Sequence, residues 1–374
     1  MAKVLVVGGG FAGVVAAESL AQTLGSDHQI TLAARTHEFV FYPALVRLAF
    51  GKAEPDDITF DLREAMLDRK VRFIEGEVAR IHLNEGYITF AGGDVVGEMA
   101  YDFLVLALGR RLATERISGF FEHCQHLLSA AAAGSFAATL QNFHRGHAVI
   151  GHCPGARLPV PVFETALALS QWLRERGERD SCRITVVSEG TIDDMFGVPM
   201  SEVLTGLLAK HDIEFVSNFP IARVTGSSVI ADDGRTINCD FRMLVPPFVG
   251  PGPLIGQRVT DEAGYVRVDA TMRVHGHERV YAAGDCVDFD GPKLGHMAVR
   301  QARVAADNIT AAIAGRAPAS VYDHQLKLVI DAGGKDSIFA QGDLWSGDPP
   351  AIKSGRFWSW AKRVQERYWE SKLG

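Results

Sequence analysis

The pattern of apolar and polar positions predicts an α/β protein in which short buried strands alternate with helices. Residues 4–7 form an apolar, β-branched run, and residues 14–18 continue as a helical stretch. Similar apolar runs predict further strands at 30–34, 71–74, 87–90 and 101–109. The last of these is almost wholly apolar, which is typical of a strand buried on both faces.

The middle of the chain repeats the pattern once, with a helix at 130–141, a strand at 147–151, a helix at 163–176 and a strand at 183–188. A later strand near 280 and a helix reaching residue 313 return to the first unit. We therefore expect two Rossmann-like, three-layer dinucleotide-binding domains followed by a C-terminal α/β segment. Their predicted bounds are 1–110 with 265–315, then 111–264, then 316–374.

A glycine-rich turn joins the first strand to the first helix and matches G-x-G-x-x-G. Gly8 permits the tight turn, Gly10 lets a pyrophosphate approach the backbone, and Gly13 lets the helix pack closely. The free amides at the helix start, with Phe11 and Ala12 inside the motif, favour the phosphates. The turn therefore predicts a dinucleotide site.

Other strand ends supply further candidate ligands. An acidic residue ordinarily ends the second strand and holds the ribose, but Ala34 and Arg35 stand there. Arg35 is either an adenine or phosphate contact or a solvated arginine. Gly109 allows close approach of a ligand to the backbone. Asp285 can reach a sugar or ribityl hydroxyl, and Lys293 comes just before a helix whose amides suit an anionic group.

The turn after the second unit's first strand departs from a nucleotide cradle. It reads Gly-His-Cys-Pro-Gly-Ala over 151–156, where Pro154 removes an amide donor and the glycine spacing is irregular. We interpret this unit as having lost, or never had, an ordinary nicotinamide site. The alternative, an irregular loop that still admits NADH, stays open.

Composition narrows the function classes. The 374 residues are 47% hydrophobic and 22% charged, and the net charge of −7 argues against a nucleic-acid partner. No apolar run is long enough to span a bilayer, and the first strand starts too early for a secretory signal. The five scattered cysteines predict neither disulfides nor a metal site, so we expect a reducing, cytoplasmic compartment.

Four motifs in order resemble the two-dinucleotide-binding-domain flavoproteins over nearly the whole chain. They are the glycine turn, 101–109, Tyr-Ala-Ala-Gly-Asp at 281–285, and 292–302. The closest likeness is to sulfide:quinone oxidoreductases, the flavoprotein subunit of flavocytochrome c sulfide dehydrogenase, and type II NADH dehydrogenases. The sulfide branch is favoured by the segments 39–45, 153–164 and 245–251.

The resemblance implies an FAD cofactor that carries an electron pair. Cys153 matches the cysteine that acts on sulfur at the flavin, a role that needs a thiolate whose pKa is lowered by a positive group or a helix end. Cys124 falls near another family cysteine, and Glu164 is either a proton relay or a helix acid stabilised by the dipole. The implied FAD ligands are Gly8, Gly10, Gly13, Arg35, Gly109 and Asp285, with Lys293 near the isoalloxazine.

One departure bears on the chemistry. The family's sulfide oxidation uses a second cysteine in the C-terminal segment, near an Asp-x-Gly. Here the segment 325–333 contains no cysteine, and no cysteine follows Cys286 anywhere in the chain. Either Cys124 substitutes, or the substrate is not sulfide. Cys153 itself is alternatively a small buried apolar residue.

Three function hypotheses follow. The first is an FAD oxidoreductase that takes electrons from a sulfide-type donor and passes them to a quinone at a pocket lined by Pro246, Pro247, Phe248 and C-terminal aromatic residues. The second is a type II NADH dehydrogenase, which would use Glu189 to hold the adenosine ribose. The third is a flavin-binding protein without catalytic activity.

The C-terminal tail combines aromatic and basic residues. Residues 353–374 carry six basic and two acidic side chains and three of the five tryptophans. Phe357, Trp360, Val364 and Tyr368 fall on one helical face, which suits a peripheral contact with the inner face of the cell membrane. The alternative is packing on the protein itself or on a second copy, which leaves a homo-oligomer open.

Overall fold

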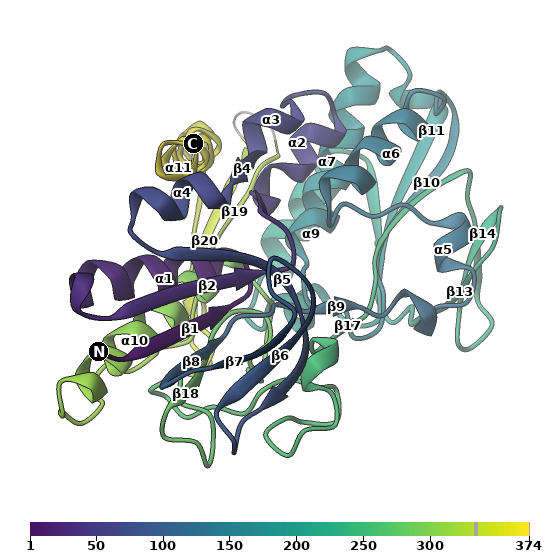
Figure 1. Ribbon diagram of the computed structural model, residues 1–374. Coiled ribbons are helices and arrows are strands. Elements are labelled where there is room, and N and C mark those ends of the chain that lie inside the picture. The colour runs from purple at the N-terminus through teal and green to yellow at the C-terminus, as the bar shows by residue number, and fades with distance from the viewer. Residues whose placement is uncertain (333–335, 374) are drawn as a thin grey trace.

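The computed structural model describes residues 1–332 and 336–373, and its first sheet has seven strands (Figure 1). The strand order is β18-β8-β1-β2-β5-β6-β7. The strands from β18 to β5 are parallel, whereas β5, β6 and β7 form an antiparallel meander. The bounds are β18 Val280–Ala282, β8 Phe103–Leu106, β1 Lys3–Val7, β2 Gln29–Ala34, β5 Arg72–His82, β6 Tyr87–Gly93 and β7 Gly97–Ala100.

Two helices pack against each other along this sheet. Helices α1 (Phe11–Leu24) and α10 (Gly295–Ile313) lie side by side although they come from opposite ends of the chain (Figure 1). Strand β18 lies just before α10 in sequence and pairs with β8, which brings the chain back to the first sheet. The carboxyl ends of β1, β8 and β18 therefore meet at one edge.

A second parallel sheet carries the middle of the chain. Its order is β12-β11-β10-β16, and α7 packs on β10, β11 and β16. A three-stranded antiparallel sheet, β13-β14-β15, accompanies it. The bounds are α6 Ala130–Leu140, β10 Gly146–His152, α7 Val160–Glu175, β11 Cys182–Ser188, α9 Ser201–Lys210, β12 Ile213–Val216, β13 Ile221–Val224, β14 Ser228–Ala231, β15 Thr236–Asn238 and β16 Phe241–Val245.

The two chain crossings between these sheets lie together, because β9 (Arg111–Leu112) pairs with β17 (Phe248–Val249). The C-terminal segment adds an antiparallel sheet of β19 (Gln325–Ile330), β20 (Ile338–Asp343) and β21 (Ala351–Ser354), then helix α11 (Arg356–Leu373). Shorter elements are β3 Glu38–Val40, α2 Leu45–Ala49, α3 Pro55–Ile58, β4 Thr59–Asp61, α4 Leu62–Asp68, α5 Phe120–His123 and α8 Ile192–Phe196.

The predicted α/β class is confirmed, with one strand shorter than predicted. The run 101–109 forms a strand only over β8. At Asp102 the strand-to-strand pattern ends, because the Lys3 amide donates at 2.7 Å to the Asp102 side-chain carboxylate instead of to a backbone carbonyl. At the other end the chain turns at Gly109, whose φ is +69°. The residues after Leu106 therefore belong to the sheet's edge, where ligands bind in such folds.

Helix α11 is attached to the first unit through an aromatic cluster. Trp369 is 4% exposed, and its ring centroid lies 4.8 Å from Phe11 and 5.5 Å from Phe39. Lys372, one turn later, forms an ion pair with Glu18 on α1. The C-terminal helix thus packs directly on the residue that follows Gly10 in the glycine turn. None of the described helices is both long and apolar enough to cross a bilayer.

We expect Trp369→Ala to lower the free energy of unfolding by about 3 kcal/mol, because it removes a buried ring and leaves a cavity. The matched control is Trp360→Ala, since Trp360 lies on the same helix but is 53% exposed, and its effect should stay within about 0.5 kcal/mol. Denaturant titration followed by circular dichroism measures both. Equal losses in the two variants would contradict the packing described for α11.

Candidate functional site

The glycine turn after β1 is closely packed on one side and open on the other. Gly8 has a φ of +118°, and a Cβ there would lie 2.0 Å from the Ala107 carbonyl oxygen. A Cβ on Gly13 would lie 1.7 Å from the Gly8 carbonyl oxygen. By contrast, a Cβ on Gly10 meets no described atom within 4 Å. The turn therefore excludes side chains where backbone packs on backbone and leaves room where a ligand would approach.

The neighbouring strand ends extend this open edge. Gly109 has a positive φ, and a Cβ built on it meets no described atom within 4 Å. Asp285 comes three residues after β18, which is hydrogen-bonded to β8. Ala34 is buried at the end of β2 beneath Gly9, whereas Arg35 is exposed.

Asp285 has a partner that the sequence analysis missed. The Arg110 guanidinium forms an ion pair with the Asp285 carboxylate, and both side chains are mostly buried, at 13% and 16% exposure. A charged residue directly after a strand-ending glycine at the carboxyl edge of a parallel sheet was the available signal. Two further groups line this region: Tyr265, whose buried hydroxyl has no hydrogen-bond partner among the described residues, and Arg157, which lies over the Tyr265 ring.

Lys293 is buried close to the same ring. Its ammonium donates to the Val287 carbonyl and lies 4.6 Å from the Tyr265 ring centroid. Burial, and then the charge of Arg157, lower the pKa of Lys293 to about 7. An amine with such a pKa gains or loses its proton readily near neutral pH. Helix α10 starts two residues later, and its first amides have no side-chain cap. This end of the site suits an anionic group.

The turn after β10 differs from the one after β1. Helix α1 begins four residues after Val7, whereas α7 begins eight residues after His152. In both turns the first amide donates to a neighbouring strand, from Gly8 to the Ala33 carbonyl at 2.8 Å and from Cys153 to the Val245 carbonyl at 3.0 Å. The second turn also uses the Ala156 amide, which donates to the Cys153 carbonyl at 2.9 Å. Since Pro154 has no amide proton, little of this turn is free to bind a pyrophosphate.

Cys153 and Cys124 lie in one apolar cluster between the second parallel sheet and the β13-β14-β15 sheet. Cys153 is fully buried with Val149 and Leu244, and Cys124 packs against that cluster. Their thiolates would repel each other. The lowered thiol pKa that the resemblance implies is not found, because burial raises the pKa of Cys153 well above its usual value. Burial also lowers the pKa of His152 to about 4, so this neighbour is uncharged at neutral pH.

Glu164 contacts the C-terminal segment. It lies on α7, is 4% exposed, and its Oε2 accepts a hydrogen bond from the Lys362 ammonium of α11 at 2.6 Å. Its Oε1 accepts from the Asp331 amide at 2.7 Å. Burial raises the pKa of Glu164, and Lys362 opposes that shift. The sequence left two roles open for Glu164, a proton relay or a helix-end acid. In the structure Glu164 also forms a buried ion pair with Lys362, which joins α7 to α11.

Gly333, the last residue of the Asp-x-Gly at 331–333, lies outside the described residues.

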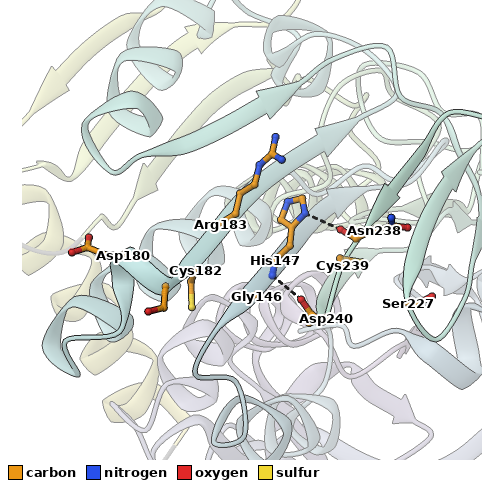
Figure 2. A pocket seen from close by; sticks show the side chains of 10 residues that line it. Gly146, His147, Asp180, Cys182, Arg183, Ser227, Asn238, Cys239 and Asp240 are labelled. Carbon is orange, nitrogen blue, oxygen red and sulfur yellow. Dashed lines mark hydrogen bonds between the residues drawn. The ribbon is translucent and has the colours of Figure 1, made fainter.

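A surface hollow of about 820 Å³ lies elsewhere, at the amino-terminal ends of β10 and β11 (Figure 2). The polar groups of His147 already have partners there. Its backbone amide donates to the Asp240 carboxylate at 2.9 Å, and its ring Nδ1 donates to the Asn238 carbonyl at 2.8 Å. The turn with Cys153 follows the opposite end of β10. The hollow is therefore separate from the site at the carboxyl edges.

Comparison with known proteins decides the family. The model for "Pyridine nucleotide-disulphide oxidoreductase" matches residues 2–302. The chain belongs to this family. A sulfide-quinone reductase of Aquifex aeolicus is 27% identical, with 100% of this chain and 92% of that protein covered. A type II NADH:quinone oxidoreductase of Mycobacterium tuberculosis is 25% identical over 81% of this chain and 70% of its own length.

Solved structures share the fold of this pyridine nucleotide-disulphide oxidoreductase. The sulfide:quinone oxidoreductase of Aquifex aeolicus superposes with a TM-score of 0.92 at 24% identity, covering 100% of this chain and 91% of that chain. Membership of the family confirms the predicted oxidoreductase class and the predicted FAD cofactor. The open face at Gly10 and Gly109 fits a dinucleotide, and bound FAD supplies an acceptor and donor of electron pairs.

The burial of Lys293 predicts a pH-dependent stability. Its pKa is about 7 in the folded chain against an ordinary 10.5, so the unfolded chain binds more protons between these values. The contribution of Lys293 to the stability of the full chain without FAD should therefore rise as pH increases from 7 towards 10.5. Above about pH 9 the buried thiols, whose pKa values are raised, oppose it. Lys293→Met should remove the Lys293 contribution, which is clearest as a lost slope between pH 7 and 9. Calorimetric melting temperatures across that range measure it. The control is Lys327→Met at an exposed position of β19, and a wild-type slope in Lys293→Met would contradict the assignment.

Proposed function

We propose that this flavoprotein transfers an electron pair from a sulfide-type donor through FAD to a quinone. The observation that carries the proposal is the turn after β10, where Pro154 has no amide proton, the Ala156 amide is bonded within the turn, and Cys153 is the first residue after the strand. The similarity to the sulfide-quinone reductase over the whole chain supports it.

The residues of the chain have distinct parts in this proposal. Gly8, Gly10, Gly13 and Gly109 shape the FAD seat, and Asp285 and Lys293 hold its polar groups. Phe11 and Ala12 complete the first helical turn, where Phe11 packs on Trp369 of α11 and Ala12 is buried. Arg35 and the strand end at Ala34 border the adenosine side.

In this proposal the thiols of Cys153 and Cys124 would bind the sulfur that the donor releases. Loss of two electrons from hydrosulfide leaves zero-valent sulfur, which a cysteine holds as a persulfide while the electron pair goes to FAD and the proton to a base or to solvent. Since no cysteine follows Cys286, Cys124 is the second thiol of this proposal. Cys239 belongs to the same apolar cluster, but Cys124 is the cysteine whose charge acts on the Cys153 thiol.

A second candidate function is oxidation of NADH. It is favoured by the similarity to type II NADH:quinone oxidoreductases and by Glu189, which is exposed directly after β11 and could accept hydrogen bonds from a ribose. It requires a nucleotide to bind at the turn after β10 without the amide of Ala156 and without a donor at Pro154.

Anaerobic stopped-flow measurements on the holoprotein separate these functions. We expect sulfide to bleach the flavin absorbance and Cys153→Ala to slow bleaching by at least about 100-fold, because the nucleophile is removed. The matched control is Cys182→Ala, since Cys182 is also a buried thiol of this sheet but begins β11 at the opposite edge. It should bleach at the wild-type rate.

The alternatives predict different results in the same experiment. Rapid bleaching by NADH with no response to sulfide would favour the NADH reaction, and Glu189→Ala should then raise the NADH concentration needed for half-maximal bleaching. Bleaching by neither donor would indicate a flavin-binding protein without either activity.

We further propose that α11 contacts a lipid surface, where a quinone acceptor would be found. Its apolar stripe is open to solvent, with Phe357 59%, Trp360 53%, Val364 41% and Tyr368 52% exposed. Helix α11 also carries five of the tail's basic residues, which favour an anionic surface.

The segment 246–248 was predicted to line the quinone pocket. Its residues are buried, and Phe248 lies under the Arg110 guanidinium.

Cosedimentation with phosphatidylglycerol-containing vesicles tests this contact. The double variant Phe357→Ser with Trp360→Ser should reduce the bound fraction by at least about fivefold, because two interfacial aromatic anchors are lost. Trp345→Ser is the matched control, since Trp345 is also 53% exposed but lies outside α11. Unchanged binding of the double variant, or an equal loss in the control, would argue against a role for the stripe.

A further inference from the structure

Three separate segments converge on the Arg110 side chain. Its guanidinium is paired with Asp285 at the end of β18, lies 4.2 Å from the ring centroid of Phe248 on β17, and lies 5.9 Å from that of Tyr42 after β3. The side chain is only 13% exposed. Because Arg110 directly follows Gly109, it lies at the open edge where the FAD seat is formed.

One donor of this guanidinium is unused. The Nε of Arg110 is buried and has no hydrogen-bond partner within residues 1–332 and 336–373. Leaving a buried charged donor unpaired costs free energy, so such a group ordinarily has a partner in the working protein. The backbone around Gly109 is open, and a ligand bound there comes within reach of this segment.

We propose that Arg110 is a positioning residue for the flavin: it orients the Asp285 carboxylate towards FAD and offers its free donor to an acceptor oxygen of the cofactor. Asp285 alone could rotate or repel an electron-rich flavin. Paired with Arg110, it keeps a fixed orientation, and the pair is neutral overall. The stacking on Phe248 fixes the guanidinium from the side of the second unit. This role holds whichever donor reduces the flavin.

The ion pair makes opposite electrostatic predictions for its two members. Removing the positive charge in Arg110→Gln leaves the Asp285 carboxylate uncompensated, which disfavours added electron density on the flavin and shifts its midpoint potential to more negative values. Asp285→Asn removes the negative charge and should shift the potential in the positive direction. A pair with a purely structural role would not give shifts of opposite sign.

The experiment compares full-length holoproteins carrying Arg110→Gln, Arg110→Lys, Asp285→Asn and Arg111→Gln. Arg111 is the matched control, because it is the neighbouring arginine but is 43% exposed and pairs with Glu115 on the surface. Dilution followed by the fluorescence of released FAD gives the dissociation constant, and spectroelectrochemical titration gives the midpoint potential. Neither readout depends on turnover.

We expect Arg110→Gln to raise the FAD dissociation constant by about tenfold or more, as for loss of a hydrogen bond to a charged group. Arg110→Lys should recover part of this loss, since it restores the charge without the planar fork. Arg111→Gln should match wild type in both readouts. Wild-type FAD affinity and potential in Arg110→Gln would overturn the proposal, and so would shifts of the same sign in Arg110→Gln and Asp285→Asn.

Discussion

The contact between two backbones at the carboxyl edge of the first sheet is the constraint on which the site depends. Gly8 lies so close to the Ala107 carbonyl, and Gly13 so close to the Gly8 carbonyl, that neither position has space for a Cβ. This packing brings the start of α1 against β1 and β8 and orients the first amides of the helix outwards. The roles proposed for Gly109, Asp285 and Lys293 depend on their meeting this turn.

The parts of the site that could be predicted have local sequence signals. A glycine needed for packing, or an apolar run before it, is visible within about ten residues, which is why the α/β class and the closely packed glycine turn could be predicted from the sequence. The pairing of Arg110 with Asp285 depends on the adjacency of β8 and β18. No periodicity connects those two residues, so only the folded chain reveals that they form one unit.

For helix α11 the sequence predicted which face is apolar but not which residues the helix packs against. Helical spacing predicted the stripe that includes Trp360, and that stripe is exposed. The opposite face carries Trp369 against Phe11 and Lys362 against Glu164, contacts that join the tail to residues far away in sequence. Helix α11 thus packs one face against residues beside the glycine turn and leaves its other face open to solvent, so the proposed lipid contact would not require the packed face to move.

The turns after β1 and β10 differ in ways that bear on what each of them can bind. After β1 the helix begins within four residues, so its amides remain available to phosphates. After β10 the connection to the helix is longer, Pro154 lacks a donor, and the Ala156 amide is bonded within the turn. The turn at the carboxyl edge of the second sheet therefore offers fewer free amides to an anion, and it carries a buried thiol, Cys153. Because burial raises the pKa of that thiol, the role proposed for Cys153 depends on what the bound flavin and the sulfur donor bring to it rather than on a neighbouring cation.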